Sequence, residues 1–271
     1  MSKKTPPQPA EATGPFVGVF SEKVTHTLGF GSTKRRQEAK TYWLIERTSA
    51  DELFIQGMNK NMVPVGDKKR LDRDAFLADY HPEPDLFLGV VRPRMRQLEE
   101  AVQRGDEHRD QDELFSAEVE YKHALQINEE EIRANFGLGI TYLKRGDMEK
   151  ATYVFNRLIT LEAAYSAEHK HLFNEFGIAL RKGRLFNEAV EYYSRAMALA
   201  ENDDHLLYNL ARVLFELRDF GRSHDLVQKA LDINPGLAEA QQLLRVLVRA
   251  EPSLMTAGLG LAELDVRTDA A

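Results

Sequence analysis

Small residues recur along this chain at a spacing close to 34 positions, and this recurrence limits the folds that are open to it. Gly105, Gly139, Gly177 and Ala211 are separated by 34, 38 and 34 residues. Twelve positions after each stands a second small residue, and four positions further on stands a large one. In chain order these two columns read Ala117, Ala151, Ala189 and Ser223, then Tyr121, Phe155, Tyr193 and Val227. Columns that keep their register over such a period indicate stacked copies of one structural unit.

The segments that carry these columns resemble the tetratricopeptide repeat (TPR) family, whose unit is a helix–turn–helix of about 34 residues. The second segment reads NFGLGITYLKRGDMEKATYVFNRLITLEA, and the fourth reads LLYNLARVLFELRDFGRSHDLVQKALDINP. In the third segment the turn glycine falls one place early, at Gly183, and Arg184 stands in its usual position. The resemblance covers about residues 132–235, is weaker over 98–131, and is absent before about residue 80. Gly or Ala in the small columns lets the two helices approach closely, with the aromatic residue beside them.

We therefore predict a mainly α chain: a TPR helix-turn-helix solenoid with a small β-rich amino-terminal extension. The four additional residues between Gly139 and Gly177 equal about one helical turn, and we expect them near AAYSAEHK, at the end of the second repeat. The predicted organisation is a disordered tail (1–16), the β-rich or α+β extension (17–82), the TPR array (83–250) and a flexible tail (251–271). The array is expected to comprise a degenerate repeat (98–131), three full repeats (132–169, 170–203 and 204–237) and a capping helix (238–250).

The extension has a different pattern from the repeats. The stretches KTYWLIER and ELFIQGM are rich in aromatic and β-branched residues, which is typical of strands, and a third short strand could follow before residue 72. DRDAFLADY begins with aspartates and predicts a short helix. Residues 85–104 read as helical with an interruption near Pro93. A small β-meander with one helix is marginal alone, so we expect it to dock on the first repeat.

Composition excludes several classes of protein. The chain has no cysteine, which removes disulfide frameworks and thiolate metal sites and suits a reducing compartment. Its amino terminus lacks the apolar core of a secretory signal, and its longest apolar run, LFLGVV, is far below the roughly 18 residues that a membrane span needs. We therefore expect a cytoplasmic protein with no membrane partner, and no cofactor is implied.

The stretch HKHLFNEFG tests whether the chain is a metalloenzyme. His169, His171 and Glu175 are close in sequence, but the spacing is not that of a known zinc motif, and no further ligand is recognisable nearby. LGFGSTK at 28–34 lacks the residue order of a phosphate-binding loop, and no nucleophile motif is visible. We expect a binding protein and not an enzyme.

The resemblance implies where a partner would bind, because the first helix of each TPR unit lines the concave side of the superhelix. Its groove-facing positions, carried over to this sequence, are Arg133, Phe136, Ile140, Lys144, His171, Asn174, Ile178, Arg181, His205, Tyr208, Asn209, Arg212 and Phe215. Glu216 is a further such position, and the last helix would add Gln242, Val246 and Arg249. An equally open reading is that some of these residues, Ile140 and Ile178 especially, pack between neighbouring helices. The Lys and Asn pair of carboxylate-clamp TPR proteins is absent from the corresponding positions.

This lining combines apolar and aromatic residues with Arg, His and Asn, as recognition surfaces do. We expect a scaffold or adaptor that binds a peptide or protein with apolar anchors and with acidic groups for Arg181 and Arg212. The alternative is a regulator whose basic amino-terminal segment, around Lys34-Arg35-Arg36, binds nucleic acid or another anionic ligand. In that case the array would sense a partner or mediate self-association. The net charge of −7 argues against nucleic acid as the main partner.

Overall fold

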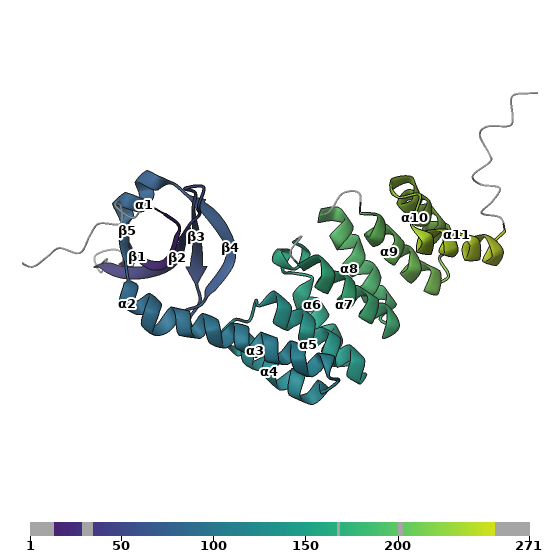
Figure 1. The fold of residues 1–271 in the computed structure, drawn as a ribbon, viewed down its shortest axis with the longest axis horizontal. Helices are drawn as coiled ribbons and strands as arrows, with labels where there is room; N and C mark the ends of the chain where they lie inside the picture. Colours follow the sequence, from purple (N-terminus) through teal and green to yellow (C-terminus); the bar gives the residue numbers. More distant parts are fainter. Residues whose placement is uncertain (1–13, 29–34, 167–168, 200–202, 253–271) are drawn as a thin grey trace, which may run out of the picture. The chain divides into compact units, whose positions relative to one another are not determined.

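The computed structural model of the chain describes residues 14–28, 35–166, 169–199 and 203–252 (Figure 1). A sheet-forming segment comes first, and helices follow to the end of the described chain. The first elements are β1 (Phe16–Leu28), β2 (Arg35–Arg47), β3 (Leu53–Met58), β4 (Pro64–Leu71), α1 (Arg73–Asp79), β5 (Tyr80–Pro82), α2 (Pro84–Leu86) and the π-helical segment η3 (Phe87–Val91). They are followed by α3 (Arg92–Asp110), α4 (Leu114–Ile127), α5 (Ile132–Arg145), α6 (Met148–Leu158), the 3₁₀ turn η4 (Glu162–Tyr165), α7 (Lys170–Lys182), α8 (Phe186–Leu199), α9 (Asp204–Glu216), α10 (Phe220–Ile233) and α11 (Ala238–Ala250).

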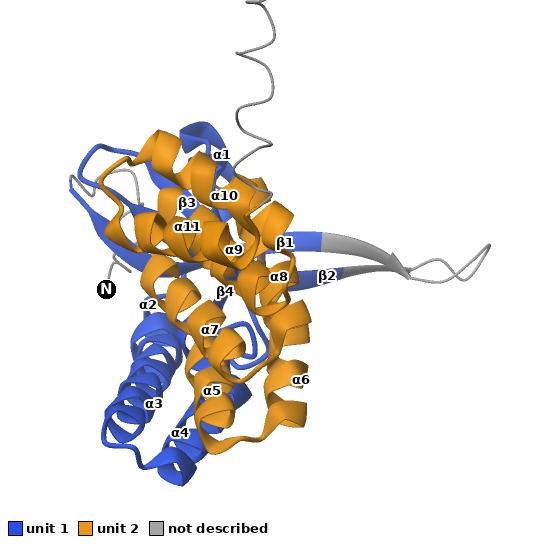
Figure 2. Cartoon of the chain, turned by 90° about the vertical axis from the view of Figure 1, so that its right-hand side faces the viewer, with its two compact units in different colours: residues 1–134 blue, residues 135–271 orange. Residues whose placement is uncertain are grey.

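The predicted fold class, helical TPR pairs after a β-rich extension, is confirmed. The chain divides into two compact units, residues 1–134 and 135–271, and the division falls within α5 (Figure 2). The sequence predicts the boundary between extension and array at residue 83. The first helical pair, α3 and α4, instead belongs to the same unit as the sheet.

The sheet of the first unit has five antiparallel strands in the order β4-β3-β2-β1-β5. The sequence predicts three short strands within residues 40–80, and the sheet additionally contains β1 and β5. Successive side chains of β1 point to opposite faces, so Phe20 and Val19 enter two different apolar clusters. Phe20 packs with Ile45, Leu53 and the α1 residue Phe76. Both faces of the sheet are therefore covered.

The predicted short helix after β4 is confirmed as α1. Its amino terminus is capped by Asp72, whose side chain accepts hydrogen bonds from the backbone N–H groups of Asp74 and Ala75. Such a cap satisfies donors that have no partner within the helix. The cap fixes the start of α1, so that Phe76 points into the sheet.

Two sets of contacts explain why α3 and α4 belong with the sheet. On the second face, Val19 and Leu44 pack against Val91, which ends η3 and leads directly into α3. The π-helical segment accounts for the interruption expected near Pro93, since a proline in the first turn of α3 has no N–H to donate to the preceding turn. At the far end of α4, two asparagines of the β3–β4 turn bind its last carbonyl groups, as described below.

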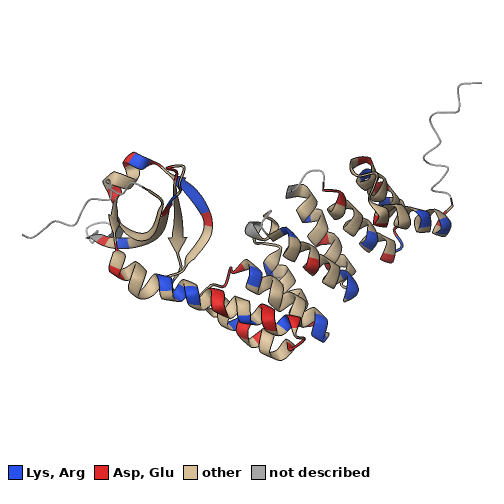
Figure 3. Cartoon of the chain, in the orientation of Figure 1, with Lys and Arg blue, Asp and Glu red and all other residues tan. Residues whose placement is uncertain are grey.

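The helix α3 is polar, as expected for a degenerate first repeat, and acidic and basic residues are interspersed along it (Figure 3). Arg104 pairs with Glu120 of α4 at 2.8 Å. The phenol of buried Tyr121 donates to Asp106 at 2.6 Å, and Arg133 pairs with the same carboxylate at 3.0 Å. Burial and the Asp106 hydrogen bond raise the pKa of Tyr121. These polar contacts join α3, α4 and the start of α5.

Within the helical pairs, the small columns mark where two helices meet. A β-carbon on Gly105 would lie 2.6 Å from the ring of Tyr121, and one on Gly177 would lie 2.4 Å from the ring of Tyr193. The second repeat differs, because the ring closest to Gly139 is that of Phe176 in α7, at 2.5 Å, and not that of Phe155. In the fourth repeat, buried Ser223 donates to the carbonyl of Ala211 at 2.7 Å. Each pair thus needs a small residue at this position.

The turns inside the four helical pairs share one backbone conformation. The residue seven positions after each member of the first small column has a positive φ: 60° at Asp112, 82° at Gly146, 63° at Arg184 and 61° at Arg218. The turn position is therefore left-handed whether or not glycine occupies it. Arg184 does take the place of the turn glycine, since Gly183 before it has a φ of −75°.

The predicted insertion between the second and third repeats contains the η4 turn. The ring centroid of Tyr165 in this turn lies 5.5 Å from that of Phe173 and 5.8 Å from that of Tyr192. Both of these residues belong to the following helical pair. Burial raises the pKa of Tyr165 to about 12, so its phenol stays protonated at neutral pH. The end of this insertion, residues 167–168, lies outside the described residues. The predicted tails do too, apart from residues 14–16 and 251–252.

Candidate partner-binding face

A pocket of about 210 Å³ lies between α9 and α11 in the second unit. We call it the α9–α11 pocket, and it is lined by Tyr208, Arg212, Phe215, Glu216, Glu239, Gln242, Leu243 and Val246. Six of these residues lie at positions that the sequence assigned to a groove: Tyr208, Arg212, Phe215, Glu216, Gln242 and Val246. The structure thus brings the predicted residues of α9 together with those of the last helix.

The amphipathic pattern of α9 places its polar and aromatic side chains at the pocket. Asp203 caps the helix by accepting hydrogen bonds from the N–H groups of His205 and Leu206. The apolar stripe of α9 is buried, and it comprises Leu206, Leu207, Leu210, Ala211, Val213 and Leu214. Tyr208, Arg212 and Phe215 are spaced i, i+4 and i+7, so they share the side of the helix that this stripe leaves half-buried.

The guanidinium of Arg212 is the distinctive group of the pocket. Its Nη1 donates to the phenol oxygen of Tyr208 at 3.1 Å. Among the described residues, no carboxylate lies within 4.0 Å of Arg212. By contrast, the neighbouring Arg181 of α7 lies 3.5 Å from Glu216. Arg212 therefore has a neutral partner and donors left over, beside the apolar walls made by Phe215 and Val246.

The helix α9 contacts α7 as well as α11, so the predicted residues of α7 lie beside those of α9. Asn209 donates to Asn174 at 3.4 Å, and Arg181 reaches Glu216. Ile178 of α7 is half-buried, while His171 and His205 are exposed. These polar contacts link the two helices into one face.

Three predicted residues do not belong to this face. Phe136 and Ile140 are 0% and 1% exposed, so they form core and cannot touch a partner. Phe136 packs edge to face on Phe176, with ring centroids 5.8 Å apart. Arg133 lies in the first unit and is bound to Glu99 and Asp106 at 2.9 and 3.0 Å. The fourth predicted residue of α5, Lys144, is exposed near the end of that helix.

Two residues of the pocket were missed from the sequence. Glu239 and Leu243 lie on the same side of α11 as Gln242 and Val246, at spacings of three and four residues. The helical period of α11 could have identified them, since residues so spaced lie on one side of a helix.

The other groups considered from the sequence either form no site within the described residues or lie outside them. No group of three or more His, Asp or Glu side chains in the described part of the chain is placed to hold a metal ion. Lys34 lies outside the described residues, as do the side chains of Arg35 and Arg36 and most of the LGFGSTK stretch. Over residues 14–28, 35–166, 169–199 and 203–252, no helix is both long and apolar enough to span a bilayer.

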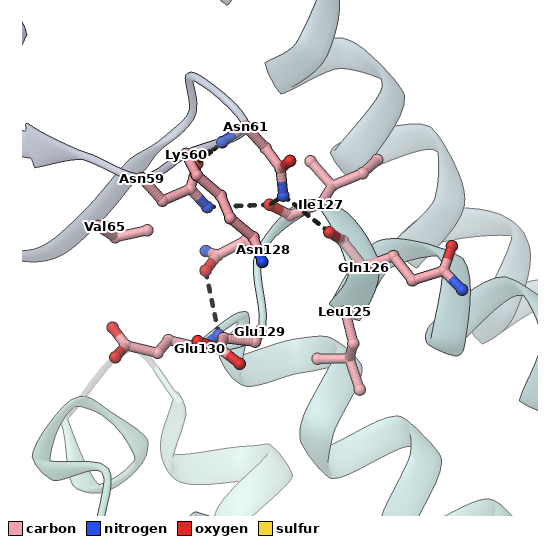
Figure 4. Close-up of a pocket in the computed structure, with 10 residues that line it drawn as sticks. All are labelled: Asn59, Lys60, Asn61, Val65, Leu125, Gln126, Ile127, Asn128, Glu129 and Glu130. Atoms are coloured by element: carbon pink, nitrogen blue, oxygen red, sulfur yellow. Dashed lines mark hydrogen bonds between the residues drawn. The ribbon is translucent and has the colours of Figure 1, made fainter.

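A larger pocket, of about 510 Å³, lies in the first unit between the β3–β4 turn and the end of α4 (Figure 4). The amides that line it bind the protein itself. Asn59 donates to the carbonyl of Ile127 at 2.9 Å, and Asn61 donates to the carbonyls of Gln126 and Ile127 at 2.8 and 2.9 Å. These bonds satisfy carbonyls that have no partner within α4. The pocket is a junction between sheet and helices.

Repeated helical pairs, each closed by a small residue where its two helices meet, define a helical-repeat protein. A family model described as tetratricopeptide repeat matches residues 184–247, the span from the α7–α8 turn into α11. This part of the chain therefore carries tetratricopeptide repeats.

Two curated relatives share the repeats. Anaphase-promoting complex subunit 3 of Schizosaccharomyces pombe is 26% identical over 141 residues, covering 52% of this chain and 21% of the relative. A TPR repeat-containing protein of Methanocaldococcus jannaschii is 25% identical over 121 residues, covering 42% of this chain and 21% of the relative. The chain thus spans about a fifth of each relative's length.

Solved structures of similar fold include MamA of Desulfovibrio magneticus RS-1, with 18% identity and a TM-score of 0.47, covering 60% of this chain and 90% of that one. YrrB, described as a TPR protein with an unusual peptide-binding site, has 20% identity and a TM-score of 0.43, covering 59% and 84%.

Proposed function

We propose that this chain is a protein-interaction scaffold whose α9–α11 pocket binds a segment of another protein. An apolar side chain of that segment enters between Tyr208, Phe215 and Val246, and a neighbouring carboxylate pairs with Arg212. An arginine fork recognises a carboxylate with two parallel hydrogen bonds, which adds direction to the apolar contact.

The observation that carries this proposal is the position of Arg212. A half-buried arginine in a protein usually has an anionic partner, because its guanidinium offers five donors and always carries charge. Here the described residues supply a phenol only, and the pocket beside it is apolar on two sides. A ligand with an acidic group would use donors that the fold leaves available.

The test compares three full-length proteins: the wild type, the double variant Tyr208→Ala/Arg212→Glu, and Lys229→Glu as a control. Lys229 is an exposed residue of α10 that lines neither pocket. Lys229→Glu therefore makes the same change of charge as Arg212→Glu, but away from the proposed binding site. Each is used to capture partners from extract of the source cells, and a captured protein is purified and titrated by calorimetry.

We expect the purified partner to bind the wild type and the control equally and the double variant at least about 30-fold more weakly, which corresponds to losing about 2 kcal/mol. Circular dichroism and thermal melting verify that the double variant is folded. A partner that binds all three proteins with one affinity contradicts the proposal.

The proposal extends to a non-catalytic role and a cytoplasmic location, and the composition and the helical repeats support both. The regulator with a basic amino-terminal ligand site stays a prediction, since its side chains lie outside those the structure describes. A titration of the full chain with single-stranded oligonucleotide at low and high salt would test it, because phosphate contacts weaken steeply with salt.

A further inference from the structure

We infer that the α9–α11 pocket is occupied by the chain's own carboxyl-terminal segment, residues 253–271, whenever no partner is bound. This inference rests on the proposed function, since it assigns a regulator to the same pocket.

The segment reads SLMTAGLGLAELDVRTDAA. Its middle carries apolar residues next to acids, with Leu261 and Leu264 around Glu263 and with Asp265 following. An apolar anchor beside a carboxylate is the chemistry that the pocket would select, because its walls are apolar and its cation has donors left over.

The segment begins where it can reach the pocket. The helix α11 supplies one wall of the pocket and ends at Ala250. At about 1.5 Å per residue, Val246 lies about 6 Å and Glu239 about 17 Å along the axis from that end. Six extended residues, such as 253–258, span up to about 20 Å. Gly258 and Gly260 permit the reversal of direction that a return along α11 requires.

The charges of the two surfaces are complementary at more than one point. Arg212 faces the acids Glu263 and Asp265 of the segment in this arrangement. The pocket also contains Glu239, an exposed residue of the first turn of α11, and the segment supplies Arg267 two residues after Asp265. Glu216 also lines the pocket, but its carboxylate should repel the acids of the segment little, because Arg181 lies 3.5 Å from it.

A tether this short makes the segment an effective competitor. Two groups joined by a short flexible linker meet at effective concentrations on the order of millimolar. A contact with a dissociation constant well below about a millimolar would then fill the pocket for most of the time. A partner would have to displace the segment, so its apparent affinity would be lower than the affinity of the open pocket.

Disulfide trapping tests this directly, because the natural chain has no cysteine. The full-length variant Gln242→Cys/Ala262→Cys places one thiol on an exposed pocket residue and one in the segment. The control is Lys229→Cys/Ala262→Cys, whose first thiol is on exposed Lys229 of α10. Both are oxidised in a glutathione buffer at low protein concentration, and the rate of disulfide formation within single chains is followed by mass spectrometry.

We expect the pocket pair to cross-link at least about ten-fold faster than the control pair, as a preferred location requires. Adding Arg212→Glu to the pocket pair should remove most of that advantage. Equal rates for the two pairs, indifference to Arg212→Glu, or disulfides formed only between chains would each overturn the inference.

A binding measurement separates this inference from the proposed function. A fluorescein-labelled synthetic peptide of residues 257–267 is titrated with the full chain and with Glu263→Lys/Asp265→Lys, a variant that weakens the internal competitor. We expect the peptide to bind the variant at least about ten-fold more tightly than the wild type. Equal binding overturns the inference. It leaves the proposed function intact if a purified partner still depends on Tyr208 and Arg212, and that function fails separately if the partner does not.

Discussion

The ring of Tyr193 fills the space that a side chain on Gly177 would need, since a β-carbon there would lie 2.4 Å from both Cζ and Oη of the tyrosine. Real β-carbons do not approach other atoms so closely, and Tyr193 is 1% exposed with little room to move. Gly177→Ala should therefore destabilise the protein by about 1–3 kcal/mol through overpacking. Urea unfolding followed by circular dichroism measures the loss.

The same contact predicts a compensating change. Tyr193→Val removes the ring, as the fourth repeat does naturally with Val227 at the corresponding position. The double variant Gly177→Ala/Tyr193→Val should be more stable than the sum of the two single changes predicts, because the new methyl group fills space that the ring vacated. Strict additivity would show that the two residues do not meet.

Gly146 and Gly221 should respond to alanine in opposite directions. Gly146 has a φ of 82°, in the left-handed region, whereas Gly221 lies in the first turn of α10 with open space around it. Gly146→Ala should cost about 1 kcal/mol or more through backbone strain. Gly221→Ala should stabilise by up to about 1 kcal/mol, because alanine is the better helix former. Thermal melting of both variants gives the comparison, and destabilisation of similar size in both would contradict it.

Asn61 should contribute to the stability of the first unit in a way that its neighbour does not. Its side chain donates to two carbonyls at the end of α4, whereas Lys60 beside it is exposed. Asn61→Ala should destabilise by about 1–2 kcal/mol, because the Gln126 carbonyl loses its side-chain donor and the Ile127 carbonyl keeps only that of Asn59. Lys60→Ala should change stability by less than about 0.5 kcal/mol. Hydrogen exchange should show faster opening of α4 in the first variant alone.

Asp204 should make stability depend on pH. The amide of Asn234 donates to its carboxylate at 2.7 Å and lowers the pKa of that group. A lowered pKa in the folded state means that the stabilisation is present above the unfolded value, about 3.9, and is lost as the pH falls through the folded value. Asp204→Asn, which has no charge to lose, should therefore be less stable than the wild type at pH 7 by about 1 kcal/mol.

That difference should shrink as the pH falls below about 3.9 and through the lowered folded pKa, because the wild-type carboxylate then becomes protonated. Asp232→Asn, in an exposed position on α10, serves as the matched control and should follow the wild type throughout. Urea titrations at several pH values between 3 and 7 provide the measurement. A gap between Asp204→Asn and the wild type that stays constant with pH would count against the charged hydrogen bond.

The helical repeats could be predicted from the sequence because their main contacts are local. Gly177 and Tyr193 are sixteen positions apart, within one helical pair, so the contact recurs as a visible pattern. The sheet could not be predicted to the same extent, since β5 pairs with β1 from about 60 residues away. Its three residues carry no strand pattern of their own.

The candidate face was predictable in part, for a similar reason. Helical spacing alone places Tyr208, Arg212 and Phe215 on one side of α9. Whether such a side is open depends on how far the neighbouring helix rotates over it, which no local pattern records. Phe136 and Ile140 occupy the equivalent positions of α5, yet Phe176 and other residues of the second unit cover them.

The turns inside the helical pairs keep one conformation with four occupants: Asp112, Gly146, Arg184 and Arg218. All of the additional length in this array lies instead between pairs, in the segment that contains η4. Within this chain the helical pair therefore has a constant length, and the length of the junction between pairs varies. In divergent copies of such an array, insertions and deletions should collect at junctions, while turns should change by substitution only.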